Sequence, residues 1–113
     1  MKFLKLIAFG LFFTSNLAFG EEDLNTSSIK HIVFYSTASS RDGEIVIQLE
    51  KETENCQQYW ISAKDSLGYR NTISSALSAY HAQSEVLIGA DPSSLWTGSG
   101  VYDTCEIIHF RVL

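Results

Sequence analysis

The stretch IKHIVFYSTASSRDGEIVIQLE, residues 29–50, decides the fold predicted for this chain. Residues 29–36 are rich in β-branched and aromatic side chains, which suit a half-buried strand. The cluster at 37–43 ends in Asp-Gly, a strong signal for a hairpin turn. Residues 44–50 then alternate, with Ile45, Ile47 and Leu49 on the face opposite Glu44, Gln48 and Glu50. The pattern predicts a β-hairpin with one buried face.

Three further strands and one helix are predicted downstream of this hairpin. The stretches 56–62 (CQQYWIS), 85–88 (EVLI) and 105–112 (CEIIHFRV) each have strand character, and in the last we expect Ile108, Phe110 and Val112 on the face opposite Ile107 and His109. Residues 69–82 change period, which predicts a helix whose apolar stripe consists of Ile73, Ala76, Leu77 and Tyr80. Asn71 or Asp65 could cap the start of this helix.

The order of these elements is β-β-β-α-β-β. Five short strands with a helix between the third and the fourth are the order of the OB-fold, a partly open Greek-key barrel. We therefore expect one domain at 29–113 that is mainly β with one helix, an OB-fold-like five-stranded Greek-key barrel whose end is plugged by the helix. An open α+β sheet carrying one helix is the alternative. The polar residues 21–28 lack a period and predict a flexible leader.

The first twenty residues have the pattern of a secretory signal peptide. Lys2 and Lys5 accompany the apolar run 6–13, and residues 18–20 (AFG) provide a small-x-small cleavage site before Glu21. The apolar run is far shorter than the roughly 20 residues of a membrane span. We predict a signal peptide at 1–20, no membrane span, and a secreted or periplasmic protein. The alternative is an uncleaved amphipathic or buried N-terminal segment.

The two cysteines, Cys56 and Cys105, predict one disulfide, since the protein is expected to be exported. In an OB barrel the third and fifth strands are parallel neighbours, and each cysteine opens one of them. This placement suits the Cα separation of about 4–7 Å that a disulfide needs. Two free thiols or a metal pair are the alternatives, but no C-x-x-C or H-x₃-H spacing supplies further metal ligands.

The charge of the chain limits its partners. The net charge is −5, and it becomes −7 once Lys2 and Lys5 are removed with the leader. The remaining Lys and Arg residues are spread singly, so the clustered basic face that nucleic acid requires is missing from the sequence. A cell-surface glycan or a partner protein remains as the expected partner.

The best ligand-binding candidates lie in the segment WTGSGVY at 96–102. An aromatic face can stack on a sugar ring, hydroxyls supply hydrogen bonds, and glycines let a ligand approach the backbone. These properties select Trp96, Thr97, Ser99 and Tyr102. The alternative is that Trp96 is a buried anchor for the loop. No catalytic residue, metal or cofactor is expected, because the three histidines fall on separate elements and no G-x-S-x-G elbow supports a triad.

The chain resembles the pentameric B subunits of bacterial AB-type toxins, in particular relatives of the subtilase-cytotoxin and pertussis-like B subunits. The resemblance lies in a leader, the sheet containing Cys56 and Trp60, the helix that ends in YHAQ (80–83), the strand 85–88 and the loop containing Trp96. It implies binding of cell-surface glycans, often sialylated, and assembly into ring-shaped homopentamers. The sugar-binding serine of that family lies near its first two strands; Ser39 and Ser40 occupy this region here, with different flanking residues. Strand 85–88 offers an edge for pairing between copies.

We therefore expect an exported small binding module, resembling toxin B subunits in glycan recognition, and not an enzyme. The alternative is a periplasmic structural, interaction or inhibitor protein without a glycan site.

Overall fold

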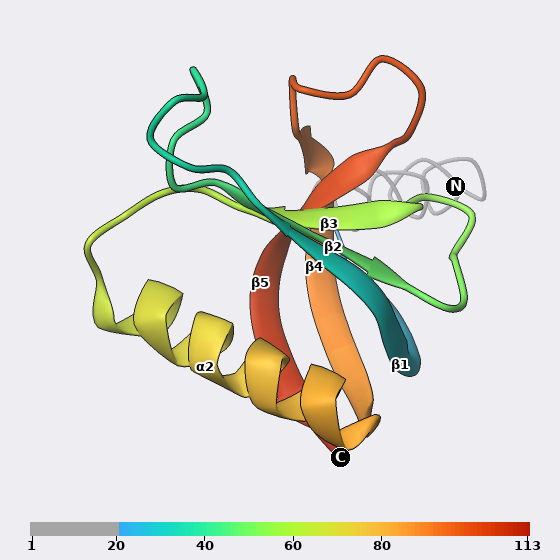
Figure 1. Cartoon of the computed structure of the whole chain (residues 1–113). Helices are drawn as coiled ribbons and strands as arrows, with labels where there is room; N and C mark the ends of the chain where they lie inside the picture. The colour runs from blue at the N-terminus through green and yellow to red at the C-terminus, as the bar shows by residue number, and fades with distance from the viewer. Residues whose placement is uncertain (1–20) are drawn as a thin grey trace, which may run out of the picture.

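The computed structural model describes residues 21–113, which form five strands and one helix (Figure 1). The elements are β1 (Asp23–Phe34), β2 (Ile45–Leu49), β3 (Gln58–Ile61), α2 (Leu67–Ala82), β4 (Glu85–Leu95) and β5 (Thr104–Val112). The predicted order, mainly β with one helix, is confirmed. The predicted signal peptide lies outside the described residues.

The strands form one mixed sheet whose hydrogen bonding closes into a ring in the order β1-β2-β3-β5-β4. All neighbours are antiparallel except β3 and β5, which run parallel, with Tyr59 opposite Cys105. Long β1 closes the ring because its first half pairs with β4 and its second half with β2. Because the hydrogen bonds close into a ring, the alternative prediction of an open α+β sheet is wrong.

The flexible leader predicted at 21–28 is wrong from Asp23 onward, because these residues begin β1. They pair with β4 from Asp23 opposite Ala90 to Ser28 opposite Glu85. Asn25 and Ser27 are buried although both are polar. Their side chains bond to the β2–β3 connection: Asn25 donates to the carbonyl oxygen of Lys51, and Ser27 Oγ accepts from the Lys51 amide. These partners satisfy the buried polar groups, so a strand without an apolar pattern can still be internal.

Strand β4 is longer than predicted and has strands on both sides. It pairs with β1 and with β5, so the stretch 85–88 has no free edge for pairing with another copy. The expectation of an edge at this position is therefore wrong. The closed ring is the physical reason, since closure uses both sides of the strand.

A bulge in β5 changes which of its side chains reach the core. Gly89 pairs with His109 and Ala90 with Ile107, so Ile108 has no partner on β4. Ile107 and Phe110 both pack against the core, whereas Ile108 is 53% exposed. The prediction of strict alternation, with Ile108 on the face of Phe110, fails because a bulge adds one residue to the count.

The core fills the ring and contains the predicted disulfide. Its members are apolar side chains from every strand together with Ala76 and Ala79 of α2. Ile45, Ile47 and Leu49 all face it, as predicted. Cys56 and Cys105 are fully buried and disulfide-bonded, with their Cα atoms 5.7 Å apart.

Helix α2 crosses one end of the sheet (Figure 1). Its N-cap is Ser66, whose hydroxyl accepts from the Tyr69 amide, and not Asn71 or Asp65 as predicted. Ile73 and Tyr80 pack against the core as expected, and Ala79 joins Ala76 as a buried residue of the helix. Leu77 is 37% exposed, so it lies at the margin of the stripe.

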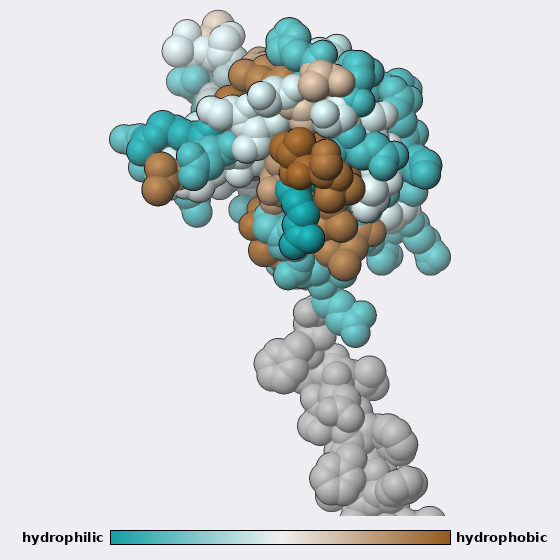
Figure 2. Space-filling view, turned by 90° about the horizontal axis from the view of Figure 1, so that it is seen from below, coloured by the Kyte–Doolittle hydropathy of each residue, from teal (hydrophilic) through white to brown (hydrophobic). Residues whose placement is uncertain are grey.

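Hydrophobic side chains remain on the surface at this end of the molecule. Figure 2, seen from below, shows them gathered in the middle of the face with hydrophilic side chains among them. Large exposed hydrophobic residues in α2, β5 and the C-terminus are Leu67, Leu77, Ile108, Val112 and Leu113. Within residues 21–113, no helix is long and apolar enough to cross a membrane.

Candidate functional site

The β1–β2 loop (35–44) and the β4–β5 loop (96–103) project from the end of the sheet opposite α2 (Figure 1). The β1–β2 loop is fixed by short-range bonds, including Ser39 Oγ accepting from the Arg41 amide. Gly43 has a φ of +87°, a conformation that favours glycine. Tyr69 of α2 donates its hydroxyl to the Gly43 carbonyl oxygen, which ties this loop to the helix.

Trp96 joins the two loops. Its indole Nε1 donates to Glu44 Oε1 at 2.9 Å, and its ring centroid lies 5.7 Å from that of Tyr35. The Arg41 guanidinium carbon lies 5.0 Å from the Trp96 ring centroid, and Arg41 Nη1 is 3.4 Å from the same Glu44 oxygen. These contacts combine a charge-assisted hydrogen bond with a cation–π interaction. Trp96 is therefore held by the β1–β2 loop, and only 8% of its surface is exposed.

The other predicted ligand-binding residues lie outward from Trp96. Thr97 and Tyr102 are exposed, the latter by 44%. Ser99 Oγ accepts from the amides of Val101 and Tyr102, so its hydroxyl organises the loop itself. Gly98 passes over the Trp96 ring, where a Cβ atom would overlap the indole. The structure thus separates a buried Trp96 from exposed hydroxyls at the loop surface.

The outer face of β2, β3 and β5 carries a further group of side chains, none of which is among the predicted ligand-binding residues. Trp60 is half-buried and donates its indole N–H to the Ser94 carbonyl oxygen at 3.1 Å. Ser94 Oγ in turn donates to Glu106 Oε1 at 2.9 Å, and Trp60 pairs with Glu106 across the parallel strands. This arrangement places an aromatic ring beside a hydroxyl and a carboxylate.

Two glutamines extend the same face. Gln58 Nε2 donates to Gln48 Oε1 at 3.5 Å, and Thr104 Oγ1 donates to Gln58 Oε1 at 3.2 Å. Both glutamines are half-buried, so their amides keep polar atoms near the surface. A signal for this face was present in the sequence, because Gln58 and Trp60 alternate with the buried Tyr59. We call Gln48, Gln58, Trp60 and Glu106 the sheet-face cluster.

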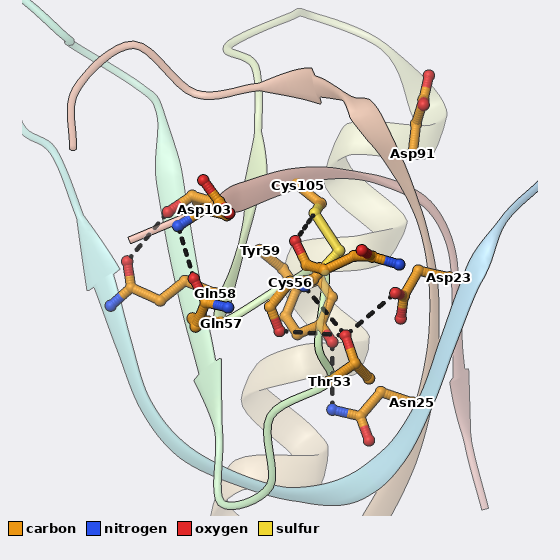
Figure 3. Close-up of a disulfide and its surroundings, with 12 residues drawn as sticks. Asp23, Asn25, Thr53, Cys56, Gln57, Gln58, Tyr59, Asp91, Asp103 and Cys105 are labelled. Carbon is orange, nitrogen blue, oxygen red and sulfur yellow. Dashed lines mark hydrogen bonds between the residues drawn. A yellow bond between two sulfur atoms is a disulfide. The ribbon is translucent and has the colours of Figure 1, made fainter. Parts of the chain in front are cut away.

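A second polar cluster lies beside the disulfide (Figure 3). Asn25 Nδ2 donates to the Tyr59 hydroxyl at 3.1 Å, and Thr53 Oγ1 donates to Asp23 Oδ2 at 3.1 Å. The amide of Cys56 donates to Thr53 Oγ1 at 3.0 Å. Burial raises the pKa of the Tyr59 hydroxyl above its ordinary value, partly offset by the hydrogen bond from Asn25. These residues hold the β2–β3 connection against β1, so their hydrogen bonds stabilise the fold.

Residues Asn25-Thr26-Ser27 fit the N-x-[ST] pattern of an N-glycosylation acceptor, and Asn25 belongs to this cluster. Asn25 is 8% exposed, and its amide nitrogen has two acceptors. The folded protein therefore does not present this nitrogen for glycosylation.

The three histidines of the chain lie on separate elements. His31, His81 and His109 lie on β1, α2 and β5. No three His, Cys, Asp or Glu residues among 21–113 are placed to hold a metal ion. Asp91 is engaged locally: hydrogen bonds from the Ser93 hydroxyl and then the Ser93 amide hold its pKa below the ordinary value.

Comparisons with protein-family models, curated proteins and solved structures find no match to this chain.

Proposed function

We propose that this protein is an exported binding module with an OB-fold-like barrel that recognises a neutral oligosaccharide. The ring order β1-β2-β3-β5-β4, the parallel β3–β5 pair and the helix between β3 and β4 support the OB-like assignment. OB-folds bind oligonucleotides and oligosaccharides on the face of strands 2 and 3, between the 1–2 and 4–5 loops. The acidic charge of the chain argues against the nucleic acid.

The sheet-face cluster is the observation that carries this proposal. Sugars present an apolar C–H face and hydroxyls that both donate and accept hydrogen bonds. An indole suits the first, and amide and carboxylate groups suit the second. Trp60, Gln48, Gln58 and Glu106 provide these groups on rigid strands, and the Trp96 contacts fix both neighbouring loops beforehand. A prearranged site loses less entropy on binding.

The charge of the site favours a neutral glycan over a sialylated one. Glu106 places a carboxylate in the cluster, and Arg41 of the β1–β2 loop already faces Glu44 and Trp96. An anionic sugar would meet the like charge of Glu106. In this respect the proposal departs from what the resemblance to toxin B subunits implies.

A glycan array probed with the purified protein tests the proposal, followed by calorimetry on the best ligand. We expect Trp60→Ala and Gln58→Ala to weaken binding by at least about tenfold, the loss of one stacking or hydrogen-bonding group. His81→Ala, on the exposed surface of α2, is the control and should bind normally. If Tyr102→Ala abolishes binding while Trp60→Ala does not, the site is the β4–β5 loop.

The alternative function, a periplasmic interaction or inhibitor protein, is favoured by one feature of the β4–β5 loop. Val101 is 85% exposed and precedes Tyr102, so the loop presents apolar surface suited to a protein pocket. A folded protein that binds nothing on the array would favour this function. A toxin B-subunit-like role is a narrower form of the glycan proposal, and it requires a secreted enzymatic subunit that copurifies with this chain.

A further inference from the structure

A cleft adjoins the sheet-face cluster where α2 packs against β5 (Figure 1). Its volume is about 190 Å³, which is space for a substituent of a few non-hydrogen atoms. Glu106 lines this cleft and also belongs to the sheet-face cluster, where it pairs with Trp60 in the parallel register. A ligand that stacks on Trp60 therefore has the cleft beside it.

The sheet side of the cleft is apolar. Ile61 at the end of β3 lines it together with Ile107 and Ile108 of β5. Ile108 is the bulge residue without a partner on β4, and 53% of its surface is exposed. The bulge thus presents an isoleucine beside a polar cluster, and a ligand gains free energy by covering it with an apolar group.

The polar side chains of the cleft differ in how far they are already engaged. The hydroxyls of Ser66 and Thr72 make hydrogen bonds with backbone groups of α2. Ser62, Lys64 and Glu106 add a hydroxyl, an ammonium and a carboxylate to the lining. Because the last two carry opposite charges, a neutral group with its own dipole suits the cleft better than an anion or a cation.

We propose that this cleft takes the acetamido group of a sugar ring, so that the oligosaccharide recognised by the sheet-face cluster contains N-acetylhexosamine. This inference rests on the proposed function, since the sugar must first bind the cluster.

An acetamido group matches the lining part by part. Its methyl group covers Ile108, and its N–H donates to the Glu106 carboxylate, of which Ser94 engages one oxygen. Its carbonyl oxygen accepts from Ser62 or Lys64. A sugar hydroxyl in the same place lacks the apolar part, and an O-acetyl ester lacks the N–H donor that suits a carboxylate.

Calorimetry with two matched pairs of sugars tests this inference. Chitotetraose is compared with cellotetraose, and N-acetyllactosamine with lactose, because the members of each pair differ in carrying an acetamido group or a hydroxyl. We expect the protein to bind the acetamido member of at least one pair about tenfold or more tightly than its partner, since a methyl group is buried and a hydrogen bond is gained.

Variants of the cleft locate this preference. Ile108→Thr and Ser62→Ala should each reduce the affinity ratio to about threefold or less, without weakening the acetamido-free sugar. Val112→Thr is the matched control, because Val112 is a similarly exposed β-branched residue of β5 that does not line the cleft. A partly unfolded variant lowers both affinities and leaves their ratio unchanged, so a change in the ratio reports on the cleft.

Three results would overturn this inference and leave the proposed function standing. The first is equal affinity for both members of every pair that binds. The second is an acetamido preference that Ile108→Thr and Ser62→Ala both leave unchanged. The third is a neutral glycan without an acetamido group as the best ligand on the array. A folded protein that binds no glycan at all would instead remove the proposed function, and this inference with it.

Discussion

At the scale of the residue, Trp96 shows how burial changes the role of an aromatic side chain. A tryptophan in a glycine-rich loop resembles a stacking platform, yet here its ring is enclosed by Tyr35, Arg41 and Gly98. The indole N–H also contributes, because it donates a hydrogen bond to the Glu44 carboxylate. Trp96 thereby couples the two loops through a partner that lies 52 residues away in sequence.

Replacing Trp96 should reveal this anchoring role. Trp96→Phe keeps most of the apolar ring but leaves Glu44 without its indole donor, so we expect a loss of about 1.5–3 kcal/mol in unfolding free energy. Trp96→Ala should cost about 3–5 kcal/mol. Urea denaturation measures both. Tyr102→Ala, on the exposed part of the same loop, should change stability by less than about 0.5 kcal/mol; an equal loss there would contradict an anchor at Trp96.

Tyr59 should make the protein less stable in alkali. Its pKa is raised in the folded state, chiefly by burial, above the ordinary value of 10.0. The unfolded chain therefore loses this proton at lower pH than the folded protein. Stability is retained below pH 10 and falls as the pH rises toward the folded pKa, by up to about 1.4 kcal/mol per pH unit.

Denaturant titrations between pH 8 and 11 measure this effect. Tyr59→Phe lowers the overall stability by removing the acceptor of Asn25, but it should also flatten the alkaline slope. Tyr102→Phe serves as the control. An unchanged slope in Tyr59→Phe would show that another group causes the alkaline loss.

At the scale of the element, helix α2 shows the difference between an apolar stripe and a packed contact. The apolar stripe predicted over residues 73–80 does face the core. Its most buried residues, however, are Ala76 and Ala79, whereas Leu77 is exposed. Small side chains at the centre let the helix backbone approach the sheet closely. Strand β5 also departs from its sequence pattern, because its bulge at Ile108 breaks the alternation of inward and outward side chains.

A pair of helix variants tests this view of α2. Leu77→Ala should cost about 1 kcal/mol or less, because Leu77 already keeps 37% of its surface exposed. Ala79→Leu should cost about 1–3 kcal/mol, because Ala79 is 1% exposed and has no space for a larger side chain. Thermal and urea unfolding measure both. The reverse ranking would mean that the helix sits on the sheet through Leu77.

At the scale of the whole molecule, one covalent bond and one closed ring of hydrogen bonds define the protein. The Cys56–Cys105 disulfide joins the start of β3 to the start of β5, across a separation of 49 residues. It therefore braces the parallel pair, which has three residue pairs in register, as few as any pairing in the ring.

Removing the disulfide should lower the free energy of unfolding. The double variant Cys56→Ala, Cys105→Ala should lose about 4 kcal/mol, since a loop of this length is no longer closed in the unfolded chain. At about 4–8 °C per kcal/mol, the fall in Tm should exceed 15 °C. Calorimetry measures it, and Cys-free protein that melts within a few degrees of the wild type would contradict the estimate. Alkylation of the native wild-type protein should find no free thiol.

The sequence by itself determined the element order, the hairpin faces of β2 and the partnership of the two cysteines. These features follow from local periodicity and from turn residues, or from a count of two cysteines, so they need no knowledge of distant contacts. The outward position of Gln58 and Trp60 follows equally from their alternation with Tyr59.

Only the tertiary structure decided the remaining features. The polar stretch 23–28 becomes a strand because β4 and the Lys51 backbone supply partners for Asn25 and Ser27. Trp96 becomes an anchor because the β1–β2 loop covers it, and Ile108 turns outward because a bulge shifts its register. In each case the deciding partner lies far along the chain, and the free energy of satisfying or burying a group depends on that partner rather than on its sequence neighbours.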